Sequence, residues 1–263
     1  MQNGNANRGG VSIIDEGDIT GVRDSGVLTL LFAHGRRPGI ENLESRSRVG
    51  AFSVSHRNAD RGLAELLING LTFHCEGLSG GSGAGIPSTE TELGEPDPSW
   101  RSGEAIAISA GPHIASGAGL PPVVRSQMDL ALALCELEGL VAVHWSPSQC
   151  CLEPFLFTRL ITRWLDGGAF PAPGLVAIHA AGEDLETRGL AFLHGRELRI
   201  GPLADLTRDD RGRLAIRLIN ELAEAAPLTK PYEFVDQAGR RYLLRPNEDG
   251  DRVSVEHLDG SGP

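Results

Sequence analysis

The sequence has little cationic charge and no long hydrophobic run. Lysine occurs once, at Lys230, and 35 Asp and Glu residues outnumber 24 Lys and Arg residues, which gives a formal charge of −11. Because nucleic acids and anionic membranes are bound through clustered basic side chains, this balance argues against both as partners. No stretch approaches the roughly 18 apolar residues of a transmembrane helix, and residues 1–10 lack the apolar centre of a signal peptide. We therefore expect a soluble, cytoplasmic protein.

Cysteine is also scarce. The chain has four, at Cys75, Cys135, Cys150 and Cys151. The last two are adjacent, and disulfides between neighbouring residues are rare and strained. The spacing resembles no extracellular disulfide framework. We therefore expect four free thiols.

The composition is that of a folded protein. Of the 263 residues, 40% are hydrophobic and 22% are charged, which is enough apolar material for a full core. Hydrophobic patterning and turn residues divide the chain into five predicted parts. They are a flexible leader (1–25), a small α/β unit (26–76), a Gly/Pro-rich acidic loop or linker (77–103), a main α+β domain (104–258) and a tail (259–263).

The order of predicted elements indicates the fold class. Strands are expected at 27–33, 51–55, 71–75, 104–110, 140–145 and 175–180, as a hairpin at 188–194 and 197–201, and in three short stretches after 232. Helical spacing predicts helices at 58–69, 122–138, 154–165 and 208–225. This order is not a regular βαβ alternation. It predicts an α+β fold, with helices packed on a mixed, mostly antiparallel sheet.

Four short sequences in the C-terminal half resemble a known bacterial family. They are GPHI at 111–114, the strand LVAVHW ending at Trp145, TRGL at 187–190 and GREL at 195–198. In this order, over residues 104–246, the chain resembles domain-of-unknown-function family four-two-six-one. The resemblance implies a fold and no catalytic residues. The association of some relatives with secretion or toxin–immunity loci implies an immunity or secretion-system accessory role.

Histidine and cysteine supply the candidate chemistry. His144 and His179 lie near the ends of two predicted strands, and Cys150 and Cys151 follow the first of these strands. If the strands are neighbours, His144, Cys150 and His179 could bind zinc. Alternatively, either cysteine could be a nucleophile activated by one of the histidines, with Glu153 or Glu183 orienting the imidazole. The competing interpretation is that all of these residues are partly buried and structural.

Other polar and aromatic residues are candidates for contacts. We expect Trp100, in the predicted linker, to be an exposed anchor for a partner, together with Thr187 and Arg188 in a surface loop. Arg188 could instead hold that loop by an ion pair. The preceding acidic residues 183–186 favour a solvated loop over a cation site, because the alternating ligands of a calcium loop are missing. Trp145 and Trp164 are expected in the core.

Three functions stay open from the sequence. The leading hypothesis is a non-catalytic protein that acts by binding a protein partner, with no cofactor. The alternative is a hydrolase or transferase that uses Cys150 or Cys151 with a histidine. The third is a structural subunit that acts by self-association. Neither the partner nor the oligomeric state follows from the sequence.

Overall fold

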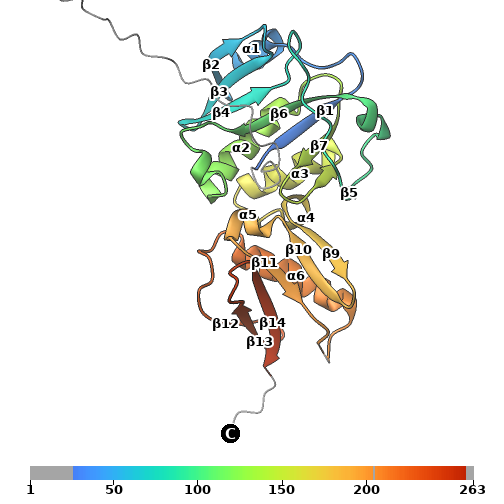
Figure 1. Cartoon of the computed structure of the whole chain (residues 1–263), viewed down its shortest axis with the longest axis vertical. Helices are drawn as coiled ribbons and strands as arrows, with labels where there is room; N and C mark the ends of the chain where they lie inside the picture. The colour runs from blue at the N-terminus through green and yellow to red at the C-terminus, as the bar shows by residue number, and fades with distance from the viewer. Residues whose placement is uncertain (1–25, 204, 259–263) are drawn as a thin grey trace, which may run out of the picture.

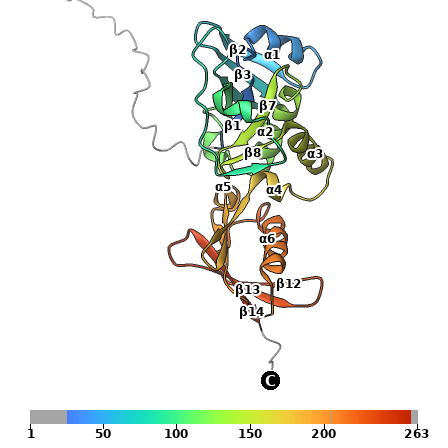
Figure 2. The same ribbon diagram turned by 90° about the vertical axis from the view of Figure 1, so that its right-hand side faces the viewer.

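The strands form two sheets in two lobes that lie one above the other in an elongated molecule (Figures 1 and 2). This computed structural model describes residues 26–203 and 205–258. The predicted leader (1–25) and tail (259–263) lie outside the described residues. We name residues 26–171 the N-terminal lobe and residues 172–258 the C-terminal lobe.

The N-terminal lobe holds an eight-stranded sheet with the order β2-β3-β4-β6-β1-β7-β8-β5. Its strand pairs are antiparallel except for β5 with β8, which is parallel. The strands are β1 (Leu28–Phe32), β2 (Ser53–Asn58), β3 (Leu63–Ile68), β4 (Leu71–Glu76), β5 (Thr91–Leu93), β6 (Glu104–Ala110), β7 (Leu140–Trp145) and β8 (Cys150–Leu152).

The C-terminal lobe holds a six-stranded sheet with the order β12-β13-β14-β11-β10-β9. Here β11 and β14 are parallel and the other pairs are antiparallel. The strands are β9 (Ala177–Ala181), β10 (Asp184–Arg188), β11 (Glu197–Ile200), β12 (Tyr232–Val235), β13 (Arg241–Pro246) and β14 (Arg252–Leu258). The predicted α+β class, with mixed and mostly antiparallel sheets, is confirmed.

The helices begin at residues suited to helix starts. Pro121 and Pro122 open one helix, and Thr207 caps another by accepting a hydrogen bond from the backbone N–H of Asp210 at 3.2 Å. The helices are α1 (Ile40–Ser47), α2 (Pro121–Leu134), α3 (Pro154–Leu165), α4 (Ala172–Leu175), α5 (Leu190–His194) and α6 (Arg208–Leu222), with 3₁₀ turns η2 (Pro98–Ser102) and η3 (Ala115–Gly117). Within the described ranges, no helix is long and apolar enough to cross a membrane.

The two faces of the N-terminal sheet differ in the size of their side chains. Along β6, Ile106 and Ile108 are buried on the face against which α2 and α3 pack. The alternate residues Ala105, Ala107 and Ser109 point to the other face because successive side chains of a strand alternate. This second face, which we call the helix-free face, is not covered by α2 or α3. The 3₁₀ turn η2 packs on part of it through Trp100, and other segments can approach the rest.

The elements α1, β5, β8 and β10 were not predicted, and two predicted elements are replaced by others. Residues 58–69, expected as a helix, form the end of β2, a turn and β3. Ala64, Leu66 and Ile68 are buried on one face, so the true period is two. The hairpin strand expected at 188–194 is instead the end of β10 followed by the short helix α5. Gly189 and Gly195 flank α5 with φ of 95° and 85°, and such a backbone interrupts a strand.

The predicted division into units also differs from the structure. Strand β1 lies between β6 and β7 in the middle of the N-terminal sheet, so residues 26–76 are not a separate unit. The expected main domain, 104–258, contributes to both sheets. The expected linker, 77–103, contains β5 and the buried Trp100. Sheet pairing between distant segments decides these boundaries, and no local pattern reports it.

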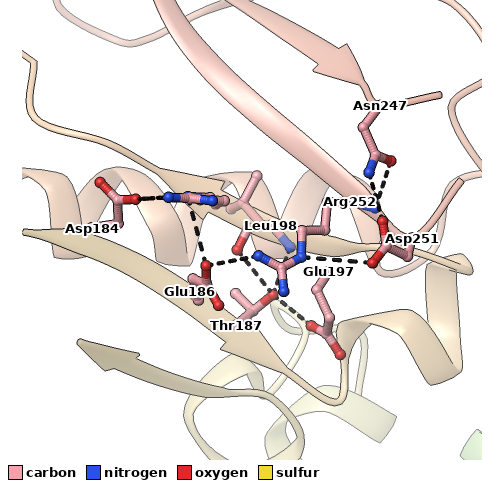
Figure 3. A network of polar contacts seen from close by, with 9 residues as sticks. Asp184, Glu186, Thr187, Glu197, Leu198, Asn247, Asp251 and Arg252 are labelled. Carbon is pink, nitrogen blue, oxygen red and sulfur yellow. Dashed lines mark hydrogen bonds and ion pairs between the residues drawn. The ribbon is translucent and has the colours of Figure 1, made fainter. Parts of the chain in front are cut away.

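The loop after β10 is held within the C-terminal lobe by the carboxylate of Glu197. This carboxylate accepts hydrogen bonds from the backbone N–H groups of residues 189–191, at 2.8, 3.2 and 3.1 Å. It also accepts one from the Thr187 hydroxyl at 2.6 Å, and that hydroxyl accepts one from Leu198 N–H at 2.7 Å. Figure 3 shows Thr187 between Glu197 and Leu198. These bonds fix the start of α5, and we call them the Glu197 clasp.

The clasp sits where the lobes meet. A Cβ on Gly189 would lie 3.0 Å from the backbone nitrogen of Ser148 and 3.0 Å from the carbonyl oxygen of Leu175. From α5, Phe192 packs edge-on against Trp145 of the N-terminal lobe, with ring centroids 5.6 Å apart. Apart from a small cluster around Trp100, the buried apolar residues of both sheets form one continuous cluster. The clasp therefore positions α5 against the N-terminal lobe.

We expect Glu197→Gln to lower the free energy of unfolding by about 2–4 kcal/mol. The amide would place an N–H donor against backbone donors, which loses charge-assisted hydrogen bonds and leaves buried N–H groups unpaired. Urea denaturation measures the change. The matched control is Glu256→Gln, which breaks an exposed ion pair with Arg245 and should cost less than about 1 kcal/mol. Equal losses in the two variants would contradict a structural role for the clasp.

Candidate functional site

His144 and Cys151 lie opposite each other on β7 and β8, and Cys150 points the other way. In the antiparallel register His144 pairs with Cys151, so both occupy the helix-free face, while Cys150 pairs with Trp145 on the helix-covered face. The His144 ring and the Cys151 thiol make no hydrogen bond with each other. All three polar side chains are at most 1% exposed. The sequence therefore correctly predicted that His144 and Cys151 lie close together, but both side chains are shielded from solvent.

The zinc hypothesis is wrong. His179 lies on β9 of the C-terminal sheet, whereas His144 and Cys150 belong to the N-terminal sheet. The condition for the hypothesis was that the two strands be neighbours, and they are in different sheets. Across the described ranges there is no group of three or more His, Cys, Asp or Glu residues that could hold a metal ion.

The cysteines are poor nucleophiles in this fold. Burial raises the pKa of Cys150 and of Cys151 to about 12, and the pKa values of Cys75 and Cys135 rise to about 12 for the same reason. The reactive species is the thiolate, which is almost absent at neutral pH for such a group. The free thiols act as small apolar core residues.

His144 has a structural task. Its Nε2 lies 3.1 Å from the carbonyl oxygen of Ser88, so Nε2 carries the proton and donates. Its Nδ1 is buried without a partner. Burial lowers the pKa of His144 to about 4, which keeps the ring neutral at physiological pH. The bond ties the segment around Ser88 to the helix-free face of the sheet.

Trp100 is not an exposed anchor. It is 4% exposed and packs on the helix-free face with Leu31, Ala142 and Cys151. The guanidinium of Arg101 lies 4.7 Å from the centroid of the Trp100 ring. The expected interaction residue therefore covers a second, smaller core, because the segment 77–103 folds back over the sheet.

Thr187 and Arg188 both make contacts that hold the structure together. Thr187 is buried in the Glu197 clasp. Arg188 donates a hydrogen bond to Gln149 at 2.7 Å and pairs with Glu90 at 2.5 Å, both from the N-terminal lobe. The alternative that Arg188 holds its loop by an ion pair is therefore the correct one, and the ion pair bridges the lobes.

The acidic residues before Thr187 are engaged on the open face of the C-terminal sheet. Asp184 and Glu186 belong to β10, where Arg199 and Arg252 pair with them; the Arg252–Glu186 distance is 3.0 Å. Figure 3 shows Glu186 beside Arg252. The predicted solvated segment is thus a charged sheet face. Trp145 and Trp164 are buried, as expected.

A pocket of about 1300 Å³ lies on the helix-free face, where the lobes meet. Its floor is formed by Thr29 of β1 and Ala107 and Ser109 of β6. Thr29 pairs with Ala107, and Ala107 pairs with Glu76 of β4, so the three side chains form one row across the sheet. At a strand spacing of about 4.8 Å, Glu76 stands roughly 10 Å from Thr29.

The walls of the pocket come from three other segments. They are the loop 84–87, with Ile86 and Pro87; the loop 115–119 around η3; and α5, with Phe192. The lining is made mostly of small apolar side chains, with hydroxyls from Thr29 and three serines. Glu76 supplies the one charge among the lining residues that the structure describes.

Sequence reasoning missed this pocket, although one signal was present. In the strand EAIAISA, small residues at 105, 107 and 109 alternate with isoleucine at 106 and 108. The isoleucines indicate a covered face, and the small residues indicate a face on which something else approaches the backbone. The approach of the loop 84–87 and of α5 could not be read from the sequence, because it depends on the clasp and on His144.

Comparisons with known proteins add no match. No protein-family model, no curated protein and no solved structure matches this chain.

We expect the four thiols to react slowly in the native protein. With 5,5′-dithiobis(2-nitrobenzoic acid) at pH 7.5, the folded protein should release little chromophore over minutes, since burial withholds both access and the thiolate form. Denaturation in guanidinium should then expose all four cysteines. A single native thiol that reacts within seconds would contradict this account and revive a cysteine nucleophile.

We expect acid to destabilise the fold through His144. Its folded pKa is about 4 and its ordinary value is 6.5, so the unfolded chain takes up the proton first. The contribution of His144 to stability is therefore fully present well above pH 6.5 and is lost as the pH drops toward 4, by up to about 1.4 kcal/mol per pH unit. His144→Gln should show a shallower fall in urea denaturation at pH 4.5–6.5.

The pKa of His194 is lowered too, chiefly by burial. Because His194 is present in both proteins, only the difference between the two slopes reports His144. Identical slopes would mean that His144 titrates normally in the folded protein.

Proposed function

We propose that this protein is a non-catalytic binding protein that receives a segment of a partner protein in the pocket between its lobes. The observation that carries the proposal is the pocket lining. It combines a floor of small residues on β1 and β6 with apolar side chains at Ile86 and Phe192 and a few hydroxyls. Such a mixture of apolar wall and scattered polar groups is typical of binding sites.

The volume favours a polypeptide over a small metabolite. Small-molecule sites enclose about 300–1,000 Å³, and this pocket has about 1300 Å³. Small floor residues let the main chain of a ligand approach the sheet closely, with the Thr29 and Ser109 hydroxyls available for its hydrogen bonds. An extended segment with small or apolar side chains fits these features.

The alternative enzyme function lacks support from the geometry. Cys150, Cys151 and His144 are buried outside the pocket lining, and the thiols hold their protons. His144 is engaged with Ser88 and supports the pocket wall. These positions favour a role in architecture for the residues that the sequence offered as catalysts.

The resemblance of residues 104–246 to family four-two-six-one bears on the biological role. The finer proposal is that this is a bacterial immunity or secretion-system accessory protein, and it rests on the four short sequence matches alone, since no family model matches the chain. Both roles consist of holding another protein without chemistry, which agrees with the proposed use of the pocket. A toxin or secretion gene beside the parent gene would favour this role, and a metabolic operon would count against it.

Blocking the pocket should abolish partner binding. We expect the affinity-tagged protein to capture a partner from the parent cell, and Ala107→Trp or Ser116→Trp to lose it, because an indole would occupy the space of the ligand. The matched control, Ser254→Trp, lies on the exposed face of β14 and should retain the partner. With the purified partner, calorimetry should show at least a tenfold rise in Kd for the pocket variants.

Circular dichroism melting checks whether each variant is folded. Ser116 is exposed on η3, so its replacement tests the pocket even if Ala107→Trp disturbs the sheet. A partner that binds the pocket variants and the control equally well would show that the pocket is not the binding site.

A further inference from the structure

The charge of the pocket lining indicates the charge of the ligand that would bind there. Glu76, at the end of β4, is exposed and lines the pocket, and no positively charged side chain lines it within the described residues. In the part of the chain that the structure describes, the Glu76 carboxylate has no hydrogen bond and no ion pair. Many other surface carboxylates of this protein pair with arginine, as Glu256 does with Arg245.

The position of Glu76 makes this free carboxylate selective. It stands at one end of the row Thr29–Ala107–Glu76, while Phe192 is contributed from α5 in the other lobe. A segment that lies along the floor therefore meets a negative charge and apolar walls in one stretch. A second acidic group there would face uncompensated repulsion, and a basic group would be attracted in a partly enclosed site.

We propose that the partner segment bound here is extended, carries an arginine or lysine that pairs with Glu76, and has an apolar side chain that packs against Ile86 and Phe192. This inference rests on the proposed function and names the chemistry of its ligand. The net charge of −11 acts in the same direction, because it speeds the approach of basic partners at low salt.

Peptide selection tests the inference. Random dodecapeptides displayed on phage are selected against the full chain, against Glu76→Lys and against Ser116→Trp. Peptides that bind the full chain but not Ser116→Trp depend on the pocket, and we expect them to share a basic residue beside an apolar one. Glu76→Lys should select an acidic residue at the same position. For a synthetic copy of one selected basic peptide, Glu76→Gln should weaken binding roughly tenfold.

A matched variant controls for nonspecific charge effects. Glu256→Gln removes a carboxylate from the C-terminal sheet, far along the chain from the pocket lining, and should leave peptide affinity unchanged. Because Glu76 is exposed, its replacement should leave the fold intact, which circular dichroism checks.

The outcomes separate the inference from the proposed function. Pocket-dependent peptides without a basic residue would overturn the inference and leave the proposed function standing. A complete lack of pocket-dependent peptides would overturn both. If peptides bind only to a protein that lacks residues 1–25, the occupant is the chain's own N-terminal segment; if Ser116→Trp abolishes self-association in light scattering, the occupant is a second copy. Either result would replace the partner named here.

Discussion

The Glu197 carboxylate fixes the start of α5, the helix whose Phe192 packs against Trp145 of the N-terminal lobe. It satisfies three backbone N–H groups at the start of α5 and the hydroxyl of Thr187. A five-residue helix is too short to be stable by itself, since helix formation is costly to nucleate. The carboxylate oxygens accept the hydrogen bonds that the free N–H groups of the first helical turn would otherwise lack. This fixes α5 so that Phe192 packs against the N-terminal lobe.

The pocket is a consequence of that placement and of a second buried contact. Phe192 forms one wall, and the bond from His144 to Ser88 holds the segment that forms another. The first contact depends on the hydrogen bonds that the Glu197 carboxylate accepts, and the second depends on a neutral imidazole whose pKa burial has lowered. Buried polar residues therefore hold the segments that form the pocket. The lining of the pocket itself consists mostly of apolar side chains and hydroxyl groups.

Local patterns predicted some elements closely and others wrongly. The helix 154–165 and the strand 140–145 have the predicted bounds, because prolines, glycines and apolar spacing agree there. The stretch 58–69 was misassigned because its leucines fit both a helical and an alternating period, and pairing with β2 and β4 decided for a strand. Thr187–Leu190 and Gly195–Leu198 stood out as sequence motifs, yet only the structure shows that Glu197 of one binds the backbone of the other.

By itself the sequence determined the fold class, the acidity, the free thiols and the core positions of Trp145 and Trp164. These follow from composition and from short-range periodicity, which act within a few residues of each position. Only the tertiary structure decided that β1 inserts between β6 and β7, that His144 and His179 belong to different sheets, and that Glu76 faces a pocket. The physical reason is that strand pairing and lobe packing bring together residues that can be more than a hundred positions apart in the sequence. The local sequence pattern does not report such contacts.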